Sequence, residues 1–500
     1  MAAQYNQAMA LPVALYSAAQ VRALDAYALE RLGVPGYTLM KRAGEAALRY
    51  LRTRWPRAHR IVVLCGGGNN GGDGYVLARF AHAAGLAVTV MAVVPAGELK
   101  GDARQAFEDF SASGGRVQPL SQEMLRTGDL IVDAMLGTGL RSAVRPETAA
   151  VIRSVRAAGR PVLALDMPSG LDSDSGAVLG EAVRADATVA FVGLKAGLYL
   201  GAGPEHAGTI FFDDLEVTAP DTAQFTPVLE RITEACVLEA LPRRPRAAHK
   251  GDFGRVLIVG GGHGMPGAVR LAGEACLRVG AGLVTVATLP ENLVAVVAGR
   301  PELMCLPVSG PGDLREPLQR ADVVAVGPGL GRDDWARGLL EAVLASDKPL
   351  VVDADALNLI AEAGGPRRGG WVLTPHPGEA ARLLGIDAGA VQRDRLGALS
   401  ALVTRYGGTV TLKGAGTLVG ADSRVPALCE RGNPGMASAG MGDVLTGATA
   451  GILAQCGDAW LAARAAVMVH AMAGDAAART GERGLIAGDV ARELQVCVNL

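Results

Sequence analysis

Short runs of β-branched and apolar residues alternate with alanine-rich, helix-forming stretches along most of the chain. In the first half the apolar runs cover residues 61–64, 87–94, 130–133, 162–166 and 188–191, and helical patterns at 74–84 and 148–158 lie between them. Strand, helix and strand at this spacing require right-handed crossovers, which produce a mostly parallel sheet with helices on both faces. The first half is therefore predicted to be an α/β domain whose ligands bind beyond the carboxyl ends of its strands.

The second half restarts the same alternation after a change in composition. Residues 217–226 are rich in Pro, Thr, Asp and Ala, and residues 242–251 resemble the segment that precedes the first strand of a new domain. Predicted strands follow at 255–259, 284–288, 323–326, 350–353, 371–374 and 408–413, with a helix at 268–279 and a pair of helices within 458–480. Because domain boundaries fall in linkers of this composition, we predict two domains, residues 1–228 and 229–500.

The composition argues against several classes of protein. A length of 500 residues allows two domains with separate cores, and a net charge of −2 provides no electrostatic surface for nucleic acid. No apolar run approaches the roughly 18 residues of a membrane span, and no basic stretch followed by an apolar core marks a signal peptide. The seven cysteines lack paired spacing, as expected in a reducing compartment. We expect a soluble cytoplasmic protein.

The first glycine-rich stretch, GGGNNGGDG at 66–74, follows an apolar run and opens a helix. Glycines let backbone N–H groups approach an anion, and a helix N-terminus favours a phosphate. The stretch is neither a dinucleotide fingerprint nor a P-loop. Its asparagines, together with Asp133 and Ser169, predict an all-oxygen nest for a hard cation. The alternative is a tight turn with asparagines in left-handed conformations.

Two further polar residues follow predicted strands of the first half. Asp166 ends the run at 162–166 and is a candidate acid or base. The alternative is a structural role, as a helix N-cap or a turn-forming aspartate. Lys195 lies in the apolar stretch FVGLKAGL. Two hypotheses are therefore comparable: a lysine buried near a site, and a solvated lysine on the surface.

The second half carries a different pair of glycine-rich stretches, LKGAGT at 412–417 and SAGMGDVLTG at 438–447. The first predicts a backbone cradle for nucleotide phosphates, and the second supplies N–H groups at a helix start with Asp443 in its first turn. A backbone anion site beside a carboxylate is what phosphoryl transfer to a hydroxyl requires, because the carboxylate accepts the hydroxyl proton. This order of motifs resembles the ribokinase-like superfamily.

The segment TPHPGE at 374–379 adds a histidine between two prolines. The fixed backbone suits His376 to a ligand contact, and a histidine bonded to a loop carbonyl is the alternative. Glu379 could coordinate Mg²⁺ on bound phosphates or simply occupy a helix first turn, where acids are favoured.

Taken together, NNGGDG and the later NPGMASAGMGDVLTG resemble the bifunctional NAD(P)H-hydrate repair enzymes, in which an NAD(P)HX epimerase is fused to an ADP-dependent (S)-NAD(P)HX dehydratase. The resemblance covers about 15–225 and 230–498 and includes DAMLGTGL, ALDMPSGLD, HKGDFGRVLIVGG and TPHPGEAARL. It implies a Rossmann-like domain followed by a ribokinase-like domain. It also implies small-molecule substrates NADHX, NADPHX and ADP, a potassium ion in the epimerase, Mg²⁺ in the dehydratase, and a homo-oligomer, a tetramer or larger.

The same resemblance implies roles for individual residues. In the first domain the substrate would contact Asn69, Asn70, Gly71, Gly72, Asp73, Gly137, Thr138, Gly139, Leu140, Arg141, Ser142, Ala143 and Asp166, and potassium would be held by Asn70, Asp133 and Ser169. In the second the hydrate would contact Ala268, Gly329, His376 and Asp443, and the nucleotide Lys413, Gly414, Ala415, Gly416, Thr417 and Gly442. Asp166, with Lys195, would act in epimerisation, and Asp443 would be the base of dehydration.

The implied chemistry is repair of hydrated NADH and NADPH. Epimerisation interconverts the R and S hydrates at C6, and dehydration of the S hydrate restores NAD(P)H with release of AMP and phosphate. One alternative is a ribokinase-like small-molecule kinase, of the hydroxyethylthiazole or pyridoxal type, fused to a binding domain. Another treats residues 1–228 as a scaffold without catalysis. The residues leave open the choice between ADP and ATP and between NADHX and NADPHX.

Overall fold

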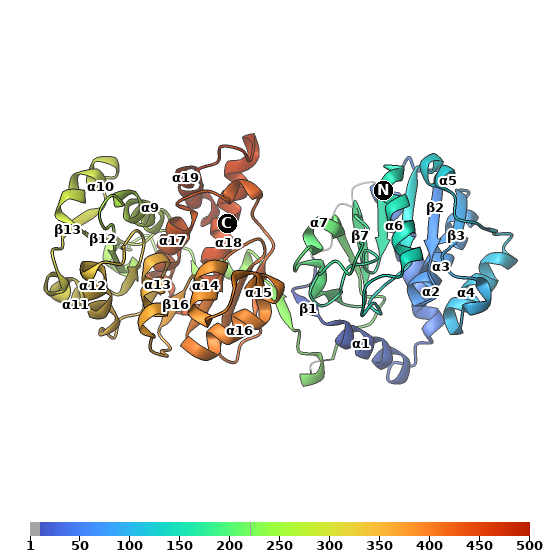
Figure 1. The fold of residues 1–500 in the computed structure, drawn as a ribbon, viewed down its shortest axis with the longest axis horizontal. Coiled ribbons are helices and arrows are strands. Elements are labelled where there is room, and N and C mark those ends of the chain that lie inside the picture. Colours follow the sequence, from blue (N-terminus) through green and yellow to red (C-terminus); the bar gives the residue numbers. More distant parts are fainter. Residues whose placement is uncertain (1–10, 221) are drawn as a thin grey trace. The chain divides into compact units, whose positions relative to one another are not determined.

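The computed structural model describes residues 11–220 and 222–500, which form two compact units divided between residues 229 and 230 (Figure 1). Each unit is built from a largely parallel sheet with helices packed on it. The predicted two-domain α/β fold class is confirmed.

The first unit holds a seven-stranded sheet in which every neighbouring pair is parallel, in the order β4-β3-β2-β5-β6-β7-β9. The strands of this sheet are β2 (Arg60–Cys65), β3 (Ala87–Ala92), β4 (Val117–Gln118), β5 (Leu130–Ala134), β6 (Val162–Leu165), β7 (Ala187–Phe191) and β9 (Thr209–Asp213). The unit also has two short strands outside this sheet, β1 (Ala14–Tyr16) and β8 (Leu194–Lys195), which pair with each other in parallel. Its helices are α1 (Ala18–Glu30), α2 (Gly36–Arg54), α3 (Asn69–Ala83), α4 (Gly101–Ala112), α5 (Gln122–Thr127), α6 (Pro146–Ala158) and α7 (Gly203–Ala207). The strand order reverses between β2 and β5, so a ligand crevice is expected at their carboxyl ends.

The period of two along β2 decides which helices cover which face of this sheet. Ile61 and Val63 pack into one core with α2, α3 and α4, whereas Val62 and Leu64 pack into another with α5 and α6. Successive side chains of a strand point to opposite faces, so a run that is apolar at every position must be covered on both.

The second unit extends a parallel sheet in the order β13-β12-β11-β14-β15-β16-β17, continued by antiparallel β18 and β19 and by β10. Its strands are β10 (Leu229–Arg231), β11 (Arg255–Val259), β12 (Leu283–Thr288), β13 (Met304–Pro307), β14 (Val323–Val326), β15 (Leu350–Val352), β16 (Trp371–Leu373), β17 (Thr409–Leu412), β18 (Thr417–Ala421) and β19 (Ala427–Cys429). Its helices are α8 (Ala235–Ala240), α9 (Pro266–Arg278), α10 (Leu293–Gly299), α11 (Arg315–Arg320), α12 (Asp334–Leu344), α13 (Ala354–Ala363), α14 (Pro377–Leu384), α15 (Ala388–Arg393), α16 (Arg395–Tyr406), α17 (Met441–Cys456), α18 (Ala459–Ala477) and α19 (Ala487–Cys497). Here the order reverses between β11 and β14.

Two predicted elements differ from the structure. Helix α3 begins at Asn69, five residues before the predicted start, so the glycine stretch forms helical turns. The predicted helix pair within 458–480 is wrong, because α18 runs as one helix and is followed by a short 3₁₀ turn at Ala478–Thr480. No Pro or left-handed Gly interrupts it before Gly481, which has φ of 139°.

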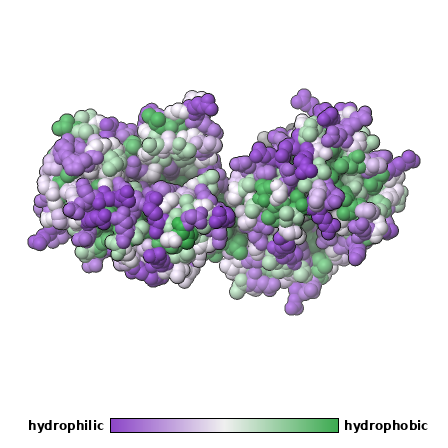
Figure 2. Space-filling view, in the orientation of Figure 1, coloured by the Kyte–Doolittle hydropathy of each residue, from purple (hydrophilic) through white to green (hydrophobic). Residues whose placement is uncertain are grey.

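The core of the second unit is built on small and branched side chains. Helix α17 is buried on most sides between α9 and α18, which is why small and apolar residues make up most of its sequence rather than one face of it. In the described residues no helix is both long and apolar enough to cross a membrane. The face of each unit seen in Figure 2 alternates hydrophilic and hydrophobic residues in small patches.

Candidate active sites

The first site lies where the strand order of the first unit reverses. Helix α3 starts directly after β2, and close approach of the backbone explains its glycines: a Cβ on Gly71 would lie 2.0 Å from the carbonyl oxygen of Gly66. Asn69 and Asn70 lie in the first turn of α3 with ordinary helical φ, so the alternative of left-handed asparagines is wrong. Gly72 and Asp73 continue the helix into the interior.

Of the three residues predicted to hold a cation, Ser169 bonds Asp133 directly, and Asn70 is linked to Ser169 through the backbone of Leu136. The Ser169 hydroxyl donates to Asp133 at 2.6 Å, and the Ser169 N–H donates to the other carboxylate oxygen at 2.8 Å. The Asn70 amide donates to the Leu136 carbonyl at 3.0 Å. Within the described residues its Oδ1 is buried without a hydrogen-bond partner. Burial raises the pKa of Asp133 to about 6 against the opposing hydrogen bonds from Ser169 and Met135.

Asp166 and Lys195 form an ion pair beside this cluster. The Lys195 side chain is fully buried and also donates to the Phe191 carbonyl at 2.8 Å, so it is not a surface lysine. Asp166 has a left-handed backbone with φ of 65°, which costs a non-glycine residue free energy and is typical of functional positions. A Cβ on Gly137 would lie 3.3 Å from both Asn70 Cβ and Asp166 Oδ2, so the loop from Gly137 passes directly over the two groups.

The rest of that loop, Thr138 to Ala143, forms an accessible rim. Arg22 of α1 donates to the Thr138 carbonyl at 3.3 Å, and Arg141 pairs with Asp174 at 3.5 Å. Gly139, Ser142 and Ala143 are exposed, and Leu140 is half-buried. An exposed loop over a buried ion pair is suited to contact a substrate from outside.

The second site centres on a buried ammonium group, Lys413. Its Nζ lies 2.6 Å from Asp353 Oδ1 and 3.7 Å from Glu379 Oε2. Thr446 of α17 donates to the other oxygen of Asp353 at 2.8 Å. Burial alone would lower the pKa of Lys413, but the carboxylates of Asp353 and Glu379 outweigh it and raise the pKa, so the lysine stays charged.

The GMGD motif forms the first turn of α17, directly above this ion pair. A Cβ on Gly442 would lie 3.3 Å from Lys413 Nζ and 3.5 Å from Asp353 Oδ2, so the backbone of this turn passes close to the ion pair. Burial, with smaller contributions from Asp353 and Asp355, raises the pKa of Asp443 to about 7 against the opposing charge of Lys413. A carboxyl whose pKa lies near neutrality is suited to accept and release a proton.

His376 has a local role that the sequence analysis did not foresee. Its Nδ1 accepts from the N–H groups of Gly378 and Glu379 at 3.0 and 3.3 Å, which caps α14, and the Glu379 carboxylate accepts from the His376 N–H at 2.7 Å. Burial first, then Lys413 and Arg382, lower the pKa of His376, which keeps the accepting nitrogen unprotonated. The ring is half-exposed and remains available to a ligand.

The predicted nucleotide loop, Lys413 to Thr417, is held by an arginine that the sequence analysis missed. Arg395 at the start of α16 donates to the carbonyls of Leu412 and Gly416 at 3.1 and 3.2 Å. Gly414 in this loop has φ of 141°, a backbone conformation that a non-glycine residue could not adopt without strain. The arginine contacts only carbonyl oxygens of the loop, and the Lys413 N–H donates to the Pro375 carbonyl at 2.9 Å.

Ala268 and Gly329, predicted to contact the hydrate, meet at the strand reversal of the second unit. A Cβ on Gly329 would lie 3.0 Å from Ala268 Cβ, and Gly329 itself accepts from the Gly262 N–H at 2.6 Å. The loops after β11 and β14 therefore touch where a ligand crevice is expected.

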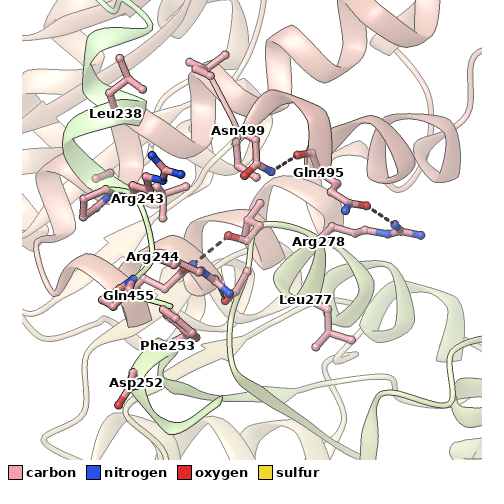
Figure 3. A pocket seen from close by; sticks show the side chains of 18 of the residues that line it. Leu238, Arg243, Arg244, Asp252, Phe253, Leu277, Arg278, Gln455, Gln495 and Asn499 are labelled. Atoms are coloured by element: carbon pink, nitrogen blue, oxygen red, sulfur yellow. Dashed lines mark hydrogen bonds between the residues drawn. The ribbon is translucent and has the colours of Figure 1, made fainter. Parts of the chain in front are cut away.

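A large cavity of about 1300 Å³ lies at the opposite, amino edge of this sheet (Figure 3). Arg243, Arg244, Arg278 and Arg300 contribute to its walls. Arg244 donates to the Gly280 carbonyl after α9 and, at 2.8 Å, to Gln455 near the end of α17. Cations at helix C-termini stabilise the helices themselves, so these contacts are structural. None of the predicted site residues lines this cavity.

Comparison with known proteins assigns the chain. Residues 36–197 match the family model of the YjeF-related protein N-terminus, and residues 256–496 match that of NAD(P)H-hydrate dehydratase. The bifunctional NAD(P)H-hydrate repair enzyme Nnr of Coxiella burnetii is 49% identical over 488 residues, which cover 97% of this chain and 99% of that one. The chain belongs to the bifunctional NAD(P)H-hydrate repair enzymes.

Other bifunctional NAD(P)H-hydrate repair enzymes and a solved structure agree with this assignment. The Escherichia coli repair enzyme is 43% identical over 492 residues, which cover 98% of this chain and 95% of that one. Among solved structures, a ribokinase-like superfamily protein from Enterococcus faecalis is 30% identical with a TM-score of 0.51, and the match covers 54% of this chain and 95% of that one. Matches to both halves in one relative support the repair hypothesis over the kinase alternative.

Proposed function

We propose that the chain repairs hydrated NADH and NADPH at two sites, an epimerase in residues 1–228 and an ADP-dependent dehydratase in residues 229–500. The observation that carries the proposal is the arrangement around Asp443: a carboxyl with a pKa of about 7 in the first turn of α17, above the Lys413–Asp353 ion pair. This arrangement combines a base with backbone N–H groups for a transferring phosphoryl group.

In the dehydratase, the C6 hydroxyl of the S hydrate attacks the terminal phosphoryl group of ADP. Asp443 takes the hydroxyl proton as the new O–P bond forms, and the bond to AMP breaks. Phosphate then departs from C6 with the C–O electron pair, pushed by the ring nitrogen lone pair, and loss of a proton from C5 restores the dihydropyridine. Phosphorylation converts a poor leaving group into a good one, which explains why a kinase-like fold performs an elimination.

The nucleotide and its metal are assigned to the loops around Lys413. In the 413–417 loop the Lys413 N–H donates to the Pro375 carbonyl at 2.9 Å, so the other N–H groups of the loop and that of Gly442 would hold the phosphates, with the Lys413 side chain beside them. His376, Ala268 and Gly329 lie toward the hydrate. Mg²⁺ prefers octahedral oxygen coordination and usually keeps several waters, so one carboxylate such as Glu379 beside the phosphates fits it. Bound there, Mg²⁺ would neutralise charge on the phosphates.

In the epimerase, Asp166 acts as the acid or base at C6, with Lys195 as its charged partner. The C6–O bond breaks as the ring nitrogen supplies electrons, and water adds to the opposite face. Asn69–Asp73 and the loop from Gly137 to Ala143 bind the phosphate-bearing substrate.

A potassium ion fits the cluster beside that ion pair. The Asn70 Oδ1 lacks a partner among the described residues, and the Asp133 carboxyl is fully buried with a raised pKa. A monovalent cation held by Asn70, Asp133 and Ser169 would satisfy the amide oxygen and favour the ionised carboxylate. Its contribution is to fix the loop that covers Asp166.

The test is recovery of NADH from its S hydrate by the purified full chain, with ADP and with ATP, each with and without potassium. We expect NADH, AMP and free phosphate with ADP. A stable phosphorylated product without NADH would instead support the kinase alternative.

Light scattering of the same preparation tests the proposed homo-oligomer, a tetramer or larger, and cell fractionation tests the proposed cytoplasmic location.

A further inference from the structure

A carboxyl outside every motif, Asp25, lies on helix α1 at the first site. The start of α1 is fixed by three contacts: β1 pairs with β8 so that Tyr16 lies opposite Lys195, Ser17 caps the helix through the N–H of Gln20, and the Ala18 N–H donates to Asp174 at 2.6 Å. The position of the helix is thereby tied to the strand that carries Lys195.

The face of α1 that carries Asp25 is turned toward the site. A Cβ on Gly193, two residues before Lys195, would lie 3.3 Å from the Val21 side chain. One residue further along α1, Arg22 reaches the carbonyl of Thr138 at 3.3 Å. Helical residues three and four apart share a face, so Asp25 lies beside Val21 and Arg22, and its side chain is half-buried there.

Asp25 faces two cations and two other carboxyls. Burial, with a smaller contribution from Asp166, raises the pKa of Asp25 to about 6 against the opposing charges of Lys195 and Arg22. Burial also raises the pKa of Asp73 well above its ordinary value, with Asp166 and Asp25 adding and Lys195 opposing. Lys195 forms its ion pair with Asp166 alone among these carboxyls. Carboxyls crowded in this way resist ionising together, which favours a proton on one of them.

Epimerisation requires two groups in opposite protonation states. A hydroxyl leaves C6 as water only when an acid gives it a proton, and water returning from the other face must lose a proton to a base. The Asp166 carboxylate, ion-paired with Lys195, is suited to be the base. The acid must therefore be another group.

We propose that Asp25 is the acid of the epimerase, giving its proton to the hydroxyl that leaves C6. The inference rests on the epimerase activity proposed above. The proton passes from the Asp25 carboxyl to the C6 oxygen, the C–O bond breaks with its electrons on oxygen, and the nitrogen lone pair forms a C=N bond. Water then adds to C6 from the opposite face and loses its proton to Asp166. Exchange with solvent resets the two carboxyls.

The experiment compares Asp25→Asn, Asp25→Glu and Glu30→Gln in the full chain. Glu30 ends the same helix and is an exposed carboxylic acid, so its substitution is the matched control. Interconversion of purified R and S hydrates is followed by chromatography across pH 6–9, with the uncatalysed rate subtracted. Dehydration of the S hydrate in the same preparations shows that each variant is folded and active in its other unit.

We expect Asp25→Asn to lower epimerisation by about 100-fold or more, the usual contribution of an acid, and to remove the fall in rate toward high pH. Asp25→Glu should recover part of the rate and restore the fall, and Glu30→Gln should match the wild type. If Asp25→Asn kept the wild-type rate and pH profile, the role of Asp25 would be wrong and the epimerase proposal would stand. Equal losses in the Asn and Glu variants would have the same meaning. A wild type no faster than the uncatalysed reaction would overturn the epimerase itself.

Discussion

Asp443→Asn is expected to inactivate the dehydratase and, at the same time, to stabilise the unit that carries it. The activity loss follows from removal of the base and should be about 100-fold or more in kcat. The gain in stability follows from burial, which raises the pKa of this carboxyl from 3.8 to about 7. A buried group with a raised pKa opposes folding whenever it is ionised, and asparagine cannot ionise.

The size of the stability effect depends on pH. Each pKa unit corresponds to about 1.36 kcal/mol, so a shift of roughly three units sets an upper bound of about 4 kcal/mol. Below the unfolded pKa the carboxyl is protonated in both states and the penalty vanishes. As pH rises toward the folded pKa of about 7 the penalty grows, and above it the penalty is constant. The variant should therefore be more stable than the wild type at pH 8 and nearly equal at pH 4.

The assay is urea unfolding of the full chain at both pH values, with the transition of the second unit followed separately. Asp347→Asn provides a control, because Asp347 is an exposed acid in the same unit. A destabilised Asp443→Asn at pH 8 would refute the electrostatic account of this site. Dehydratase activity should also rise with pH through about 7 in the wild type, because the base must be ionised.

Three other substitutions give separate expectations. Asp166→Asn should reduce epimerisation by about 100-fold in the assay with purified epimers and leave dehydration of the S hydrate unchanged. Arg395→Lys should raise the KM for ADP more than it lowers kcat in steady-state assays, since a lysine cannot reach the same carbonyls of the 413–417 loop. Lys413→Met should destabilise the second unit by about 3–5 kcal/mol in urea unfolding, because it leaves the buried Asp353 carboxylate without its cation.

The alternation of apolar runs predicted the fold class because parallel strands buried on both faces need continuous apolar sequence. Polar residues at the ends of parallel strands meet at one edge of the sheet, and this rule predicted that Asp133 and Asp166 lie close to the same site. The same rule applied to residues 350–353 would have found Asp353, the partner of Lys413. Its role went unnoticed because no glycine motif marks it.

Other residues had no signal in the sequence. Arg395 bonds backbone carbonyls 17 to 21 positions away, and any residue type supplies a carbonyl. Asp25 depends on how α1 packs against Gly193, which is a tertiary contact. The early start of α3 is a similar case, because glycines disfavour helices locally, and the close contacts that require them, such as that of Gly71 with Gly66, are tertiary.

The central claim is that one chain holds two independent repair sites, and an equal mixture of R and S hydrates tests it most directly. With ADP, the wild type should convert the whole mixture to NADH in one continuous phase. Asp166→Asn should convert the S half at the wild-type rate and then slow to the uncatalysed rate of epimerisation. Complete conversion at full speed by Asp166→Asn, or loss of both phases together, would contradict the account.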